Sequence, residues 1–414
     1  MRYLIKISYY KIMEERFYNI YNSAEKLESK KLGEVYTPEY MVKNMVDQIP
    51  DEVWMNKDIK VLDFACGTGI FAFFIYKKLI KYFDHDYVMN NVLYFNDIQE
   101  KNIKKINYIF DNPRNVHNGD FLTWNCNMKF DVIIGNPPFQ AHDNKKSNGN
   151  AIWHKFVDKL LLLLNDGGYL SLIHPSGWRK PSTEKCKYTY LYYELTQKRQ
   201  MIYLEIHSQK EGIKNFKCDI KYDIYLVENV MPHKNTKVID YDKNVMDVDL
   251  KKLKFIPNNN IEFIFRLLNC KGNNIRIVYS SSVYDIRRKH VSSTRDSLYK
   301  YPLIHSITRN GLKYKYSSRN DLGHFGVSKI VITLLPGVKN TCQHYIDIEG
   351  KYGMTSNVFG IEVDSVEYAN KIATALSTEK FRIFKDAFNF HTRTLEFRSF
   401  YYFTDGIWNL FLEQ

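Results

Sequence analysis

The sequence predicts an α/β protein in which a doubly wound, mostly parallel sheet is followed by a smaller mixed α+β region. Short apolar runs, each followed by turn residues and a helical pattern, recur between about residues 59 and 228. After about residue 232 the pattern changes to short strands with Gly, Asn and Ser turns. Because the chain has 414 residues and 44% hydrophobic content, we expect two ordered domains of ordinary size.

The first region begins with a helical extension and continues with six strands. Residues 1–32 predict the extension, because residues 10–32 are rich in helix formers with apolar side chains at helical spacing. Strands are expected at residues 60–62, 92–95, 131–134, 169–173, 201–204 and 220–227. In such sheets ligands bind beyond the carboxyl ends of the strands. We therefore expect an extension at 1–32, a ligand-binding domain at 33–231 and a second domain at 232–414.

Positive charge is concentrated in the second domain. The chain has a net charge of +13 and a pI near 9.1, which suits a polyanionic partner. Residues 1–230 contain 32 Lys and Arg against 28 Asp and Glu, and the remaining residues contain 27 against 18. The charge that needs a partner is therefore expected mainly in the C-terminal half.

Other sequence features restrict the compartment and the chemistry. No apolar run approaches the ~20 residues that cross a bilayer, and the N-terminus lacks a signal-peptide core, so we expect an intracellular, cytoplasmic protein with no membrane partner. The six cysteines lie far apart without a CxxC pair. We therefore expect free buried thiols, no disulfides and no metal site.

The turn after the first strand has the features of a cofactor site. Residues 61–71 form a buried strand, an acidic residue (Asp63), a small-residue turn and a helix that begins near Ile70. Gly67 and Gly69 remove side chains where a ligand would press on the backbone. No third glycine follows, and Asp63 would repel a pyrophosphate, so a dinucleotide is disfavoured. A cofactor that carries an ammonium group fits better, and the alternative is an ordinary tight turn.

Two further acidic residues follow the next strands. Asp97 ends residues 94–97 and is placed to accept both hydroxyls of a ribose, while Ile98 can pack on an adenine face. Asp120 can accept from an adenine amino group while Phe121 lies against the ring. Either acid alone is more typical of a solvated turn, but three acids at successive strand ends favour a site.

The strand at residues 130–135 stops at Asn136-Pro137-Pro138-Phe139. Consecutive prolines cannot donate to a sheet ladder and fix the direction of the Pro137 carbonyl. The Asn136 side-chain oxygen and that carbonyl can each accept a hydrogen from an exocyclic amine, which turns the nitrogen lone pair toward an electrophile. Phe139 offers a face on which a base can stack. A plain strand-ending turn is the alternative.

The order of these motifs resembles that of the γ-group amino-methyltransferases, specifically site-specific DNA adenine-N6 methyltransferases of restriction-modification or orphan type. The resemblance covers about residues 33–228. It implies a Rossmann-like, S-adenosylmethionine-dependent catalytic domain followed by a target recognition domain, and a methyl transfer to adenine N6 in double-stranded DNA after base flipping. The motif usually has Pro after the acid, where this chain has Phe64.

The resemblance also implies roles for individual residues. Residues 33–38 resemble the motif that precedes the first strand, so Thr37 is expected at the methionine end of S-adenosylmethionine. The remaining cofactor contacts that it implies are Asp63, Ala65, Gly67, Asp97, Ile98, Asp120 and Phe121. Asn136 to Phe139 match the catalytic motif, and Phe216 resembles an aromatic residue that faces the flipped base.

Base flipping requires DNA contacts on both sides of the reacting pocket. The polar tract at residues 140–150 is a candidate for one side. Cations of the second domain supply phosphate binders and base readers. They are Arg287, Arg288, Lys289, His290, Arg295, Arg309, Lys313, Lys315 and Arg319, with Asn310 and Asn320 beside them.

Other functions fit part of this pattern. An RNA (rRNA) base-amine methyltransferase and a DNA cytosine-N4 methyltransferase use the same acceptor pair, a protein-glutamine methyltransferase needs no basic domain, and a binding protein that has lost catalysis would not need Asn136. The 32 residues ahead of the first motif leave no room for a fused nuclease. We therefore expect a stand-alone methylase, either solitary or paired with a separate cognate restriction endonuclease. The motifs do not distinguish a monomer from a dimer.

Overall fold

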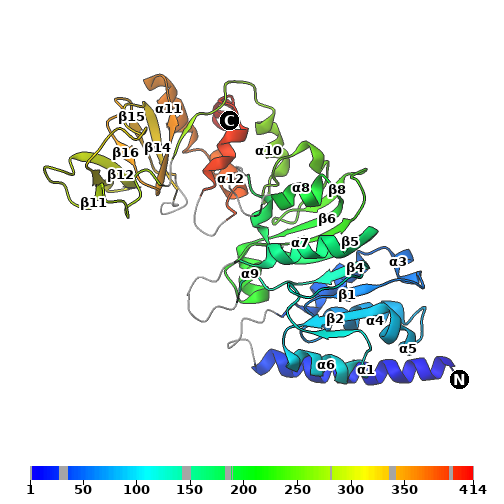
Figure 1. Ribbon diagram of the computed structural model, residues 1–414. Helices are drawn as coiled ribbons and strands as arrows, with labels where there is room; N and C mark the ends of the chain where they lie inside the picture. The colour runs from blue at the N-terminus through cyan, green and yellow to red at the C-terminus, as the bar shows by residue number, and fades with distance from the viewer. Residues whose placement is uncertain are drawn as a thin grey trace. The chain divides into compact units, whose positions relative to one another are not determined.

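The computed structural model describes residues 2–27, 36–141, 151–181, 188, 190–279, 282–334, 342–390 and 395–413. The chain divides into two compact units. The first consists of Met1–Trp178 and Lys187–Lys254, and the second of Arg179–Cys186 and Phe255–Gln414. Figure 1 shows both units, with labels on many of their elements.

A large, mostly parallel sheet forms the centre of the first unit. Its described strands follow the order β3-β2-β1-β4-β5-β7-β6-β8-β9. Strands β3, β2, β1, β4 and β5 run parallel to one another, whereas β7 is antiparallel to both β5 and β6. The strands are β1 (Val61–Asp63), β2 (Leu93–Asp97), β3 (Val116–Asn118), β4 (Phe130–Gly135), β5 (Leu164–Pro175), β6 (Gln200–His207), β7 (Tyr222–Glu228), β8 (Thr236–Ile239) and β9 (Val245–Val248).

Helices cover the sheet of the first unit. They are α1 (Arg2–Leu27), α2 (Glu39–Asp47), α3 (Asp51–Met55), α4 (Ile70–Leu79), α5 (His85–Tyr87), α6 (Glu100–Ile109), α7 (Trp153–Leu163), α8 (Tyr190–Thr196) and α9 (Gln209–Phe216). Apolar residues of α1, α2, α4 and α6 share one core with alternate residues of the strands, such as Val132 and Ile134. The aromatic rings of Phe64, Phe121 and Phe156 of α7 form a separate cluster. The predicted doubly wound α/β class is confirmed.

The boundaries of the first unit differ from the expected ones at both ends. Helix α1 is part of the core rather than a separate extension, because Phe17 is fully buried and stacks on Phe73 with ring centroids 4.1 Å apart. At the other end, β8 pairs with β6 and β9 pairs with β8, so the sheet continues beyond residue 232. The two units divide between residues 254 and 255. The sequence did not indicate that the sheet continues here, because β8 and β9 are short and are separated by polar residues.

The second unit is mixed α+β and contains two four-stranded sheets in its described part, with orders β10-β17-β14-β15 and β11-β13-β12-β16. Its strands are β10 (Ile277–Val278), β11 (Val291–Ser292), β12 (Tyr301–Thr308), β13 (Gly311–Ser317), β14 (Lys329–Thr333), β15 (His344–Asp347), β16 (Gly353–Met354) and β17 (Val358–Glu362). Its helices are α10 (Ile261–Leu268), α11 (Val366–Ala375), α12 (Glu379–Ala387) and α13 (Ile407–Leu412). Residues of these helices and of the first sheet form a core rich in phenylalanine.

The described cysteines are free thiols, but they are not all buried. Cys66 is buried, Cys126, Cys270 and Cys342 are half-buried, and Cys218 is exposed because it follows the end of α9. Cys186 lies outside the described residues. No helix in the part of the chain that the structure describes is long and apolar enough to cross a membrane.

Candidate active site

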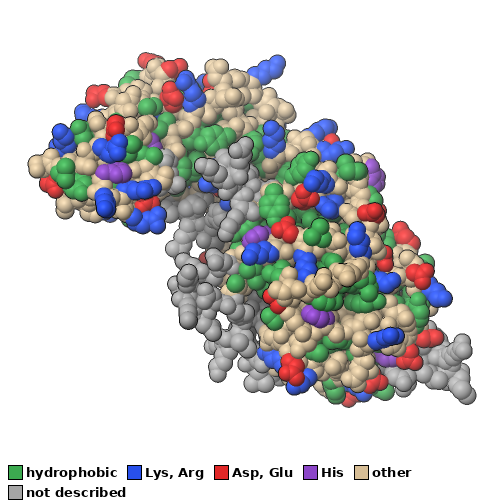
Figure 2. Space-filling view, in the orientation of Figure 1, with side chains coloured by type: hydrophobic (Ala, Val, Ile, Leu, Met, Phe, Trp, Pro, Cys, Tyr) green, Lys and Arg blue, Asp and Glu red, His purple; other side chains and the backbone are tan. Residues whose placement is uncertain are grey.

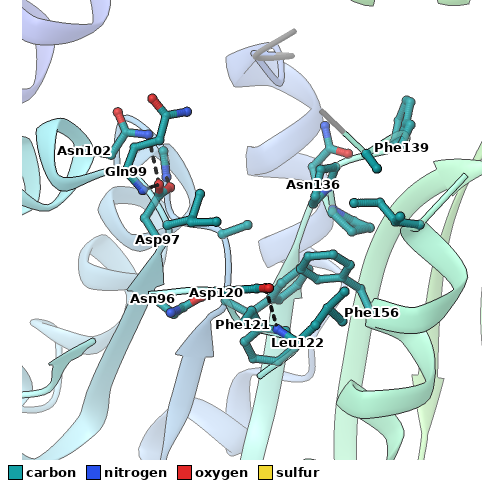
Figure 3. Close-up of a pocket in the computed structure, with 18 of the residues that line it drawn as sticks. Asn96, Asp97, Gln99, Asn102, Asp120, Phe121, Leu122, Asn136, Phe139 and Phe156 are labelled. Atoms are coloured by element: carbon teal, nitrogen blue, oxygen red, sulfur yellow. Dashed lines mark hydrogen bonds between the residues drawn. The ribbon is translucent and has the colours of Figure 1, made fainter. Parts of the chain in front are cut away.

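A cavity of about 460 Å³ lies at the carboxyl ends of β1, β2 and β4, where the fold predicts a ligand site. The structure brings most of the predicted site residues together here. Those that line the cavity are Ala65, Gly67, Asp97, Ile98, Asp120, Phe121, Asn136, Pro137, Pro138 and Phe139. Thr37, Asp63 and Phe216 do not line it. In Figure 3, Asp97 lies on one side of the cavity, and Asn136 and Phe139 lie on the other.

The turn after β1 brings the backbone close to the cavity. Gly67 has a φ of +52°, which favours glycine, and no atom within 3.9 Å would block a side chain there. Gly69, the residue before α4, has a φ of +81°, and a Cβ on it would lie 2.9 Å from Ile106 Cδ1. The backbone conformation therefore favours glycine at both positions. A side chain at residue 67 would meet no close neighbour, whereas one at residue 69 would collide with Ile106 of α6.

Phe64 stands where the resembled motif usually has proline. It follows β1 and lines the cavity. The side chain is fully buried, and a Cβ on Gly135 would lie only 2.8 Å from its Cε1 atom. Its ring packs 5.5 Å from that of Phe121. Phe64 therefore packs against both Gly135, at the end of β4, and Phe121, which lines the cavity.

Asp97 ends β2 and organises the backbone around it. Its Oδ2 accepts from the Gly67 N–H at 2.9 Å, and its Oδ1 accepts from the Gln99 N–H at 2.8 Å. Asn102 Nδ2 of α6 also donates to Oδ1, at 3.2 Å. Since a carboxylate has about four acceptor positions, three are already used. Gln99 and Asn102 were not expected from the sequence, although their place in the first turn of the next helix could have indicated them.

Asp63 lies behind the cavity, with only 1% of its surface exposed. Burial, together with the nearby Asp97, raises the pKa of its carboxyl group to about 8, against the opposing effect of the backbone amides of Ala72 and Ala65. Neither of its carboxylate oxygens accepts a hydrogen bond of normal geometry from the residues that the structure describes. A buried carboxyl group of this kind favours a positive charge nearby.

The turn after β3 forms an aromatic wall of the cavity. Asp120 is exposed there, and its Oδ1 accepts from the Leu122 N–H at 2.9 Å. The buried Phe121 ring stacks on Phe156 of α7, with centroids 5.6 Å apart and planes at 13°. Ile98, from the β2 end, is 66% exposed although it is apolar. An apolar face, a ring and a carboxylate are therefore available to a flat heterocycle.

Lys159 of α7 holds this turn in place, which the sequence did not indicate. Its ammonium group donates to the carbonyl oxygens of Phe121, Leu122 and Trp124. It also lies 5.0 Å from the centre of the Phe121 ring. Burial lowers the pKa of Lys159, and the three carbonyl groups replace the water that it has lost.

Asn136 follows β4, and its side-chain amide is oriented by a residue far away in the sequence. Its Nδ2 donates to Thr37 Oγ1 at 3.2 Å. Its Oδ1 is buried, and no donor among the described residues reaches it. A buried acceptor without a partner costs stability, so it is suited to a donor that arrives with a ligand. Thr37, expected at the cofactor, is found against Asn136.

Phe139 and Phe216 meet although they are far apart in the sequence. Their rings pack edge to face with centroids 6.3 Å apart and planes at 88°. Phe216 ends α9 and also contacts Tyr222 of β7 at 4.7 Å. The predicted base-facing residue therefore lies against Phe139 of the predicted catalytic motif.

The predicted cations of the second unit gather on and beside the sheet β11-β13-β12-β16. Lys313 and Lys315 lie on β13, and Arg309 and Asn310 form the turn between β12 and β13. Residues 287–290 precede β11, and Arg319 and Asn320 follow β13. Two of these cations have acidic neighbours, because Arg287 pairs with Asp285 and Arg319 with Asp321. Figure 2 shows Lys and Arg side chains exposed on the viewed face of this unit.

The polar tract expected to close on DNA is only partly described. Gln140 forms an antiparallel bridge with Ala151, which brings the two ends of the tract together. Residues 142–150 lie outside the described residues. The prediction for this tract therefore remains a prediction.

Comparison with known proteins agrees with this geometry. A model of the family described as "Eco57I restriction-modification methylase" matches residues 15–226. A Mycoplasma pneumoniae protein described as an uncharacterized adenine-specific methylase is 48% identical over 54 residues, which is 12% of this chain and 12% of that protein. The chain therefore matches only a small part of that relative.

Among solved structures, a nuclease-deletion mutant of the Type ISP restriction-modification enzyme LlaGI, in complex with a DNA substrate mimic, is 13% identical with a TM-score of 0.53. The match covers 89% of this chain and 46% of that one, and it shows a shared fold. A modification subunit of a putative type I restriction enzyme from Vibrio vulnificus is 18% identical with a TM-score of 0.41, over 52% of this chain and 49% of that chain. Because the family model matches just over half of its residues, the chain belongs to the Eco57I restriction-modification methylase family.

Proposed function

We propose that the protein transfers a methyl group from S-adenosylmethionine to the N6 amine of an adenine in double-stranded DNA, after that base has left the helix. The observation that carries the proposal is the buried Oδ1 of Asn136 at the cavity wall, which accepts no hydrogen bond from the residues that the structure describes. An acceptor held in that state is suited to a donor that arrives with the substrate. An exocyclic amine is such a donor.

The cavity suits S-adenosylmethionine in its shape and its charge. Gly67 leaves open space for the methionine end, and the buried Asp63 behind the turn favours a cation. Ile98 and Phe121 offer apolar faces to an adenine, and Asp120 offers an acceptor to its amino group. The bound cofactor would supply an electrophilic methyl group. Asp97 would accept from the ribose, although its bonds to Gly67, Gln99 and Asn102 leave room for about one further donor.

Asn136, Pro137 and Phe139 would orient the target base. The Asn136 Oδ1 and the Pro137 carbonyl each accept one amine hydrogen, so the nitrogen lone pair turns away from the ring and toward the cavity. The nitrogen becomes acidic as it gains the methyl group, so no separate general base is required. The edge-to-face contact with Phe216 would hold the Phe139 ring in place, and a flipped base would stack on a face of that ring.

Double-stranded DNA is the proposed partner. Support comes from the cations around the sheet β11-β13-β12-β16, because phosphate contacts by Lys and Arg provide most of the affinity of such interfaces. The family name connects its members with restriction-modification systems. We propose that this protein acts either with a separate cognate endonuclease or alone.

The direct test is a transfer assay with labelled cofactor. Purified protein is incubated with unmethylated double-stranded DNA, and the hydrolysed nucleosides are separated. We expect the label in N6-methyladenine. Label in N4-methylcytosine would change the target base, and label only in RNA, or in no nucleic acid, would exclude the proposal.

The replacement Asn136→Ala tests the catalytic group. Removal of the acceptor should reduce the transfer rate about 100-fold or more, because preorganised polar groups that act at the transition state contribute on this scale. The dissociation constant of S-adenosylhomocysteine should change little. Asn91→Ala, at an exposed position of the same unit, is the control and should retain full activity. A fully active Asn136→Ala protein would show that another group positions the amine.

A further inference from the structure

We infer that Thr37 is a positioning residue for Asn136, which it holds so that the Asn136 Oδ1 is presented to the target amine. The inference rests on the proposed function, and it differs from the cofactor contact that the motif resemblance implies for Thr37. It starts from the hydrogen bond from Asn136 Nδ2 to Thr37 Oγ1, which joins residues 99 positions apart.

The backbones on both sides of this hydrogen bond are restricted. Thr37 precedes Pro38 and Asn136 precedes Pro137, and a residue before proline is confined mainly to extended conformations. Pro38 also starts helix α2, where its carbonyl accepts from the amides of Met41 and Val42. Helix α2 is in turn fixed in the core by its buried apolar residues. The Thr37 hydroxyl therefore lies at a rigid point.

The chemistry of the amide explains why this point matters. A side-chain amide has one accepting end and one donating end, and only the accepting end suits a target amine. When Oδ1 accepts from the amine, Nδ2 points away from it and needs an acceptor of its own. Thr37 is 4% exposed, and its hydroxyl is the acceptor that the structure provides for Nδ2. Without it, the Asn136 Nδ2 group would lose the hydrogen bond that fixes the orientation of the amide.

Two substitutions separate this role from a cofactor contact. Thr37→Val keeps the shape of the side chain but removes the acceptor, and Thr37→Ser keeps the acceptor. We expect Thr37→Val to lower kcat about tenfold, which is the typical effect of one lost hydrogen bond, with the dissociation constant of S-adenosylhomocysteine unchanged within about twofold. Thr37→Ser should restore kcat. Thr196→Val, which removes another buried hydroxyl of the same unit, should leave both values unchanged.

A raised dissociation constant with an intact kcat in Thr37→Val would overturn the inference and support the cofactor contact. An unchanged kcat together with an unchanged dissociation constant would overturn it as well. A readout independent of activity is the NMR signal of the Asn136 side-chain amide, which is assigned by its loss in Asn136→Ala.

That signal should shift in Thr37→Val and return in Thr37→Ser, and a signal indifferent to Thr37→Val would show that the hydrogen bond does not exist. If the wild-type protein methylated no nucleic acid, the proposed function would fail, and the positioning role would fall with it. The NMR signal would still report whether the hydrogen bond forms, so the two failures are distinguishable.

Discussion

Asp63 carries a carboxyl group that burial keeps protonated near neutral pH. The ordinary pKa of an aspartate is near 3.8, and in the folded protein that of Asp63 is about 8. The folded state therefore holds the proton more tightly than the unfolded chain does. The stabilisation from this proton is complete below about pH 4 and is lost as the pH rises through about 8. A bound cation would reverse the effect, because it favours the charged carboxylate.

The replacement Asp63→Asn tests this linkage. Because Asn does not titrate, we expect the melting temperature of the variant to rise relative to that of the wild type as the pH increases from about 4 to about 8. Thermal unfolding of both proteins over this range measures the difference. Parallel curves would show that the Asp63 carboxyl group titrates normally. S-adenosylmethionine should bind Asp63→Asn more weakly than the wild type, which calorimetry can check.

At the scale of elements, helix α7 supports the turn that follows β3. Phe156 stacks under Phe121, and Lys159, one turn further along the helix, donates to three carbonyl oxygens of that turn. The turn contains Asp120 and Phe121, the proposed contacts of the cofactor adenine. The position of this half of the cavity therefore depends on one lysine of a helix that contributes no proposed cofactor contact of its own.

We predict that Lys159→Met raises the dissociation constant of S-adenosylhomocysteine about tenfold, because the turn loses hydrogen bonds that each contribute about 1 kcal/mol. The transfer rate at saturating cofactor should stay close to the wild-type value. Titration calorimetry and saturation kinetics measure the two quantities. Lys155→Met, at an exposed position of the same helix, is the control. Equal cofactor affinity in the two variants would show that the turn holds its shape without Lys159.

For the whole molecule, the division into two units separates the proposed chemistry from the proposed DNA recognition. The described residues that line the cavity belong to the first unit, and the predicted cations are carried by the second. Within the second unit, Lys313 and Lys315 are two residues apart on β13, so their side chains leave the same face of the sheet. That face is where we expect phosphate contacts.

The double replacement Lys313→Ala with Lys315→Ala should weaken binding to a mixed-sequence duplex at every salt concentration. It should also reduce the slope of the logarithm of the binding constant against that of the salt concentration by about two, or one for each lost phosphate contact. Fluorescence anisotropy at several salt concentrations measures the slope. Lys251→Ala with Lys252→Ala, at exposed positions of the first unit, is the control. An unchanged slope would place the phosphate contacts elsewhere.

Much of the first unit could be predicted from local patterns. All six expected strands are present, and α4 begins at Ile70 as the turn chemistry indicated. Strand β3 was given no residue range, although Asp120 was expected at a strand end, because residues 116–118 contain only one apolar residue. The role of α1 was also missed, since its burial depends on a partner surface on α4 that a single segment does not reveal.

The sequence by itself determined which strand ends surround the cavity. The motifs follow strand ends, and in a parallel sheet the carboxyl ends of the strands lie at one edge, so Asp97, Asp120 and Asn136 had to converge. Only the tertiary structure decided how those side chains are held. The partners Asn102, Lys159 and Thr37 come from three other segments, and no spacing along the chain encodes a contact between residues 37 and 136. Such contacts depend on how the helices pack on the sheet, and packing is decided by the whole core.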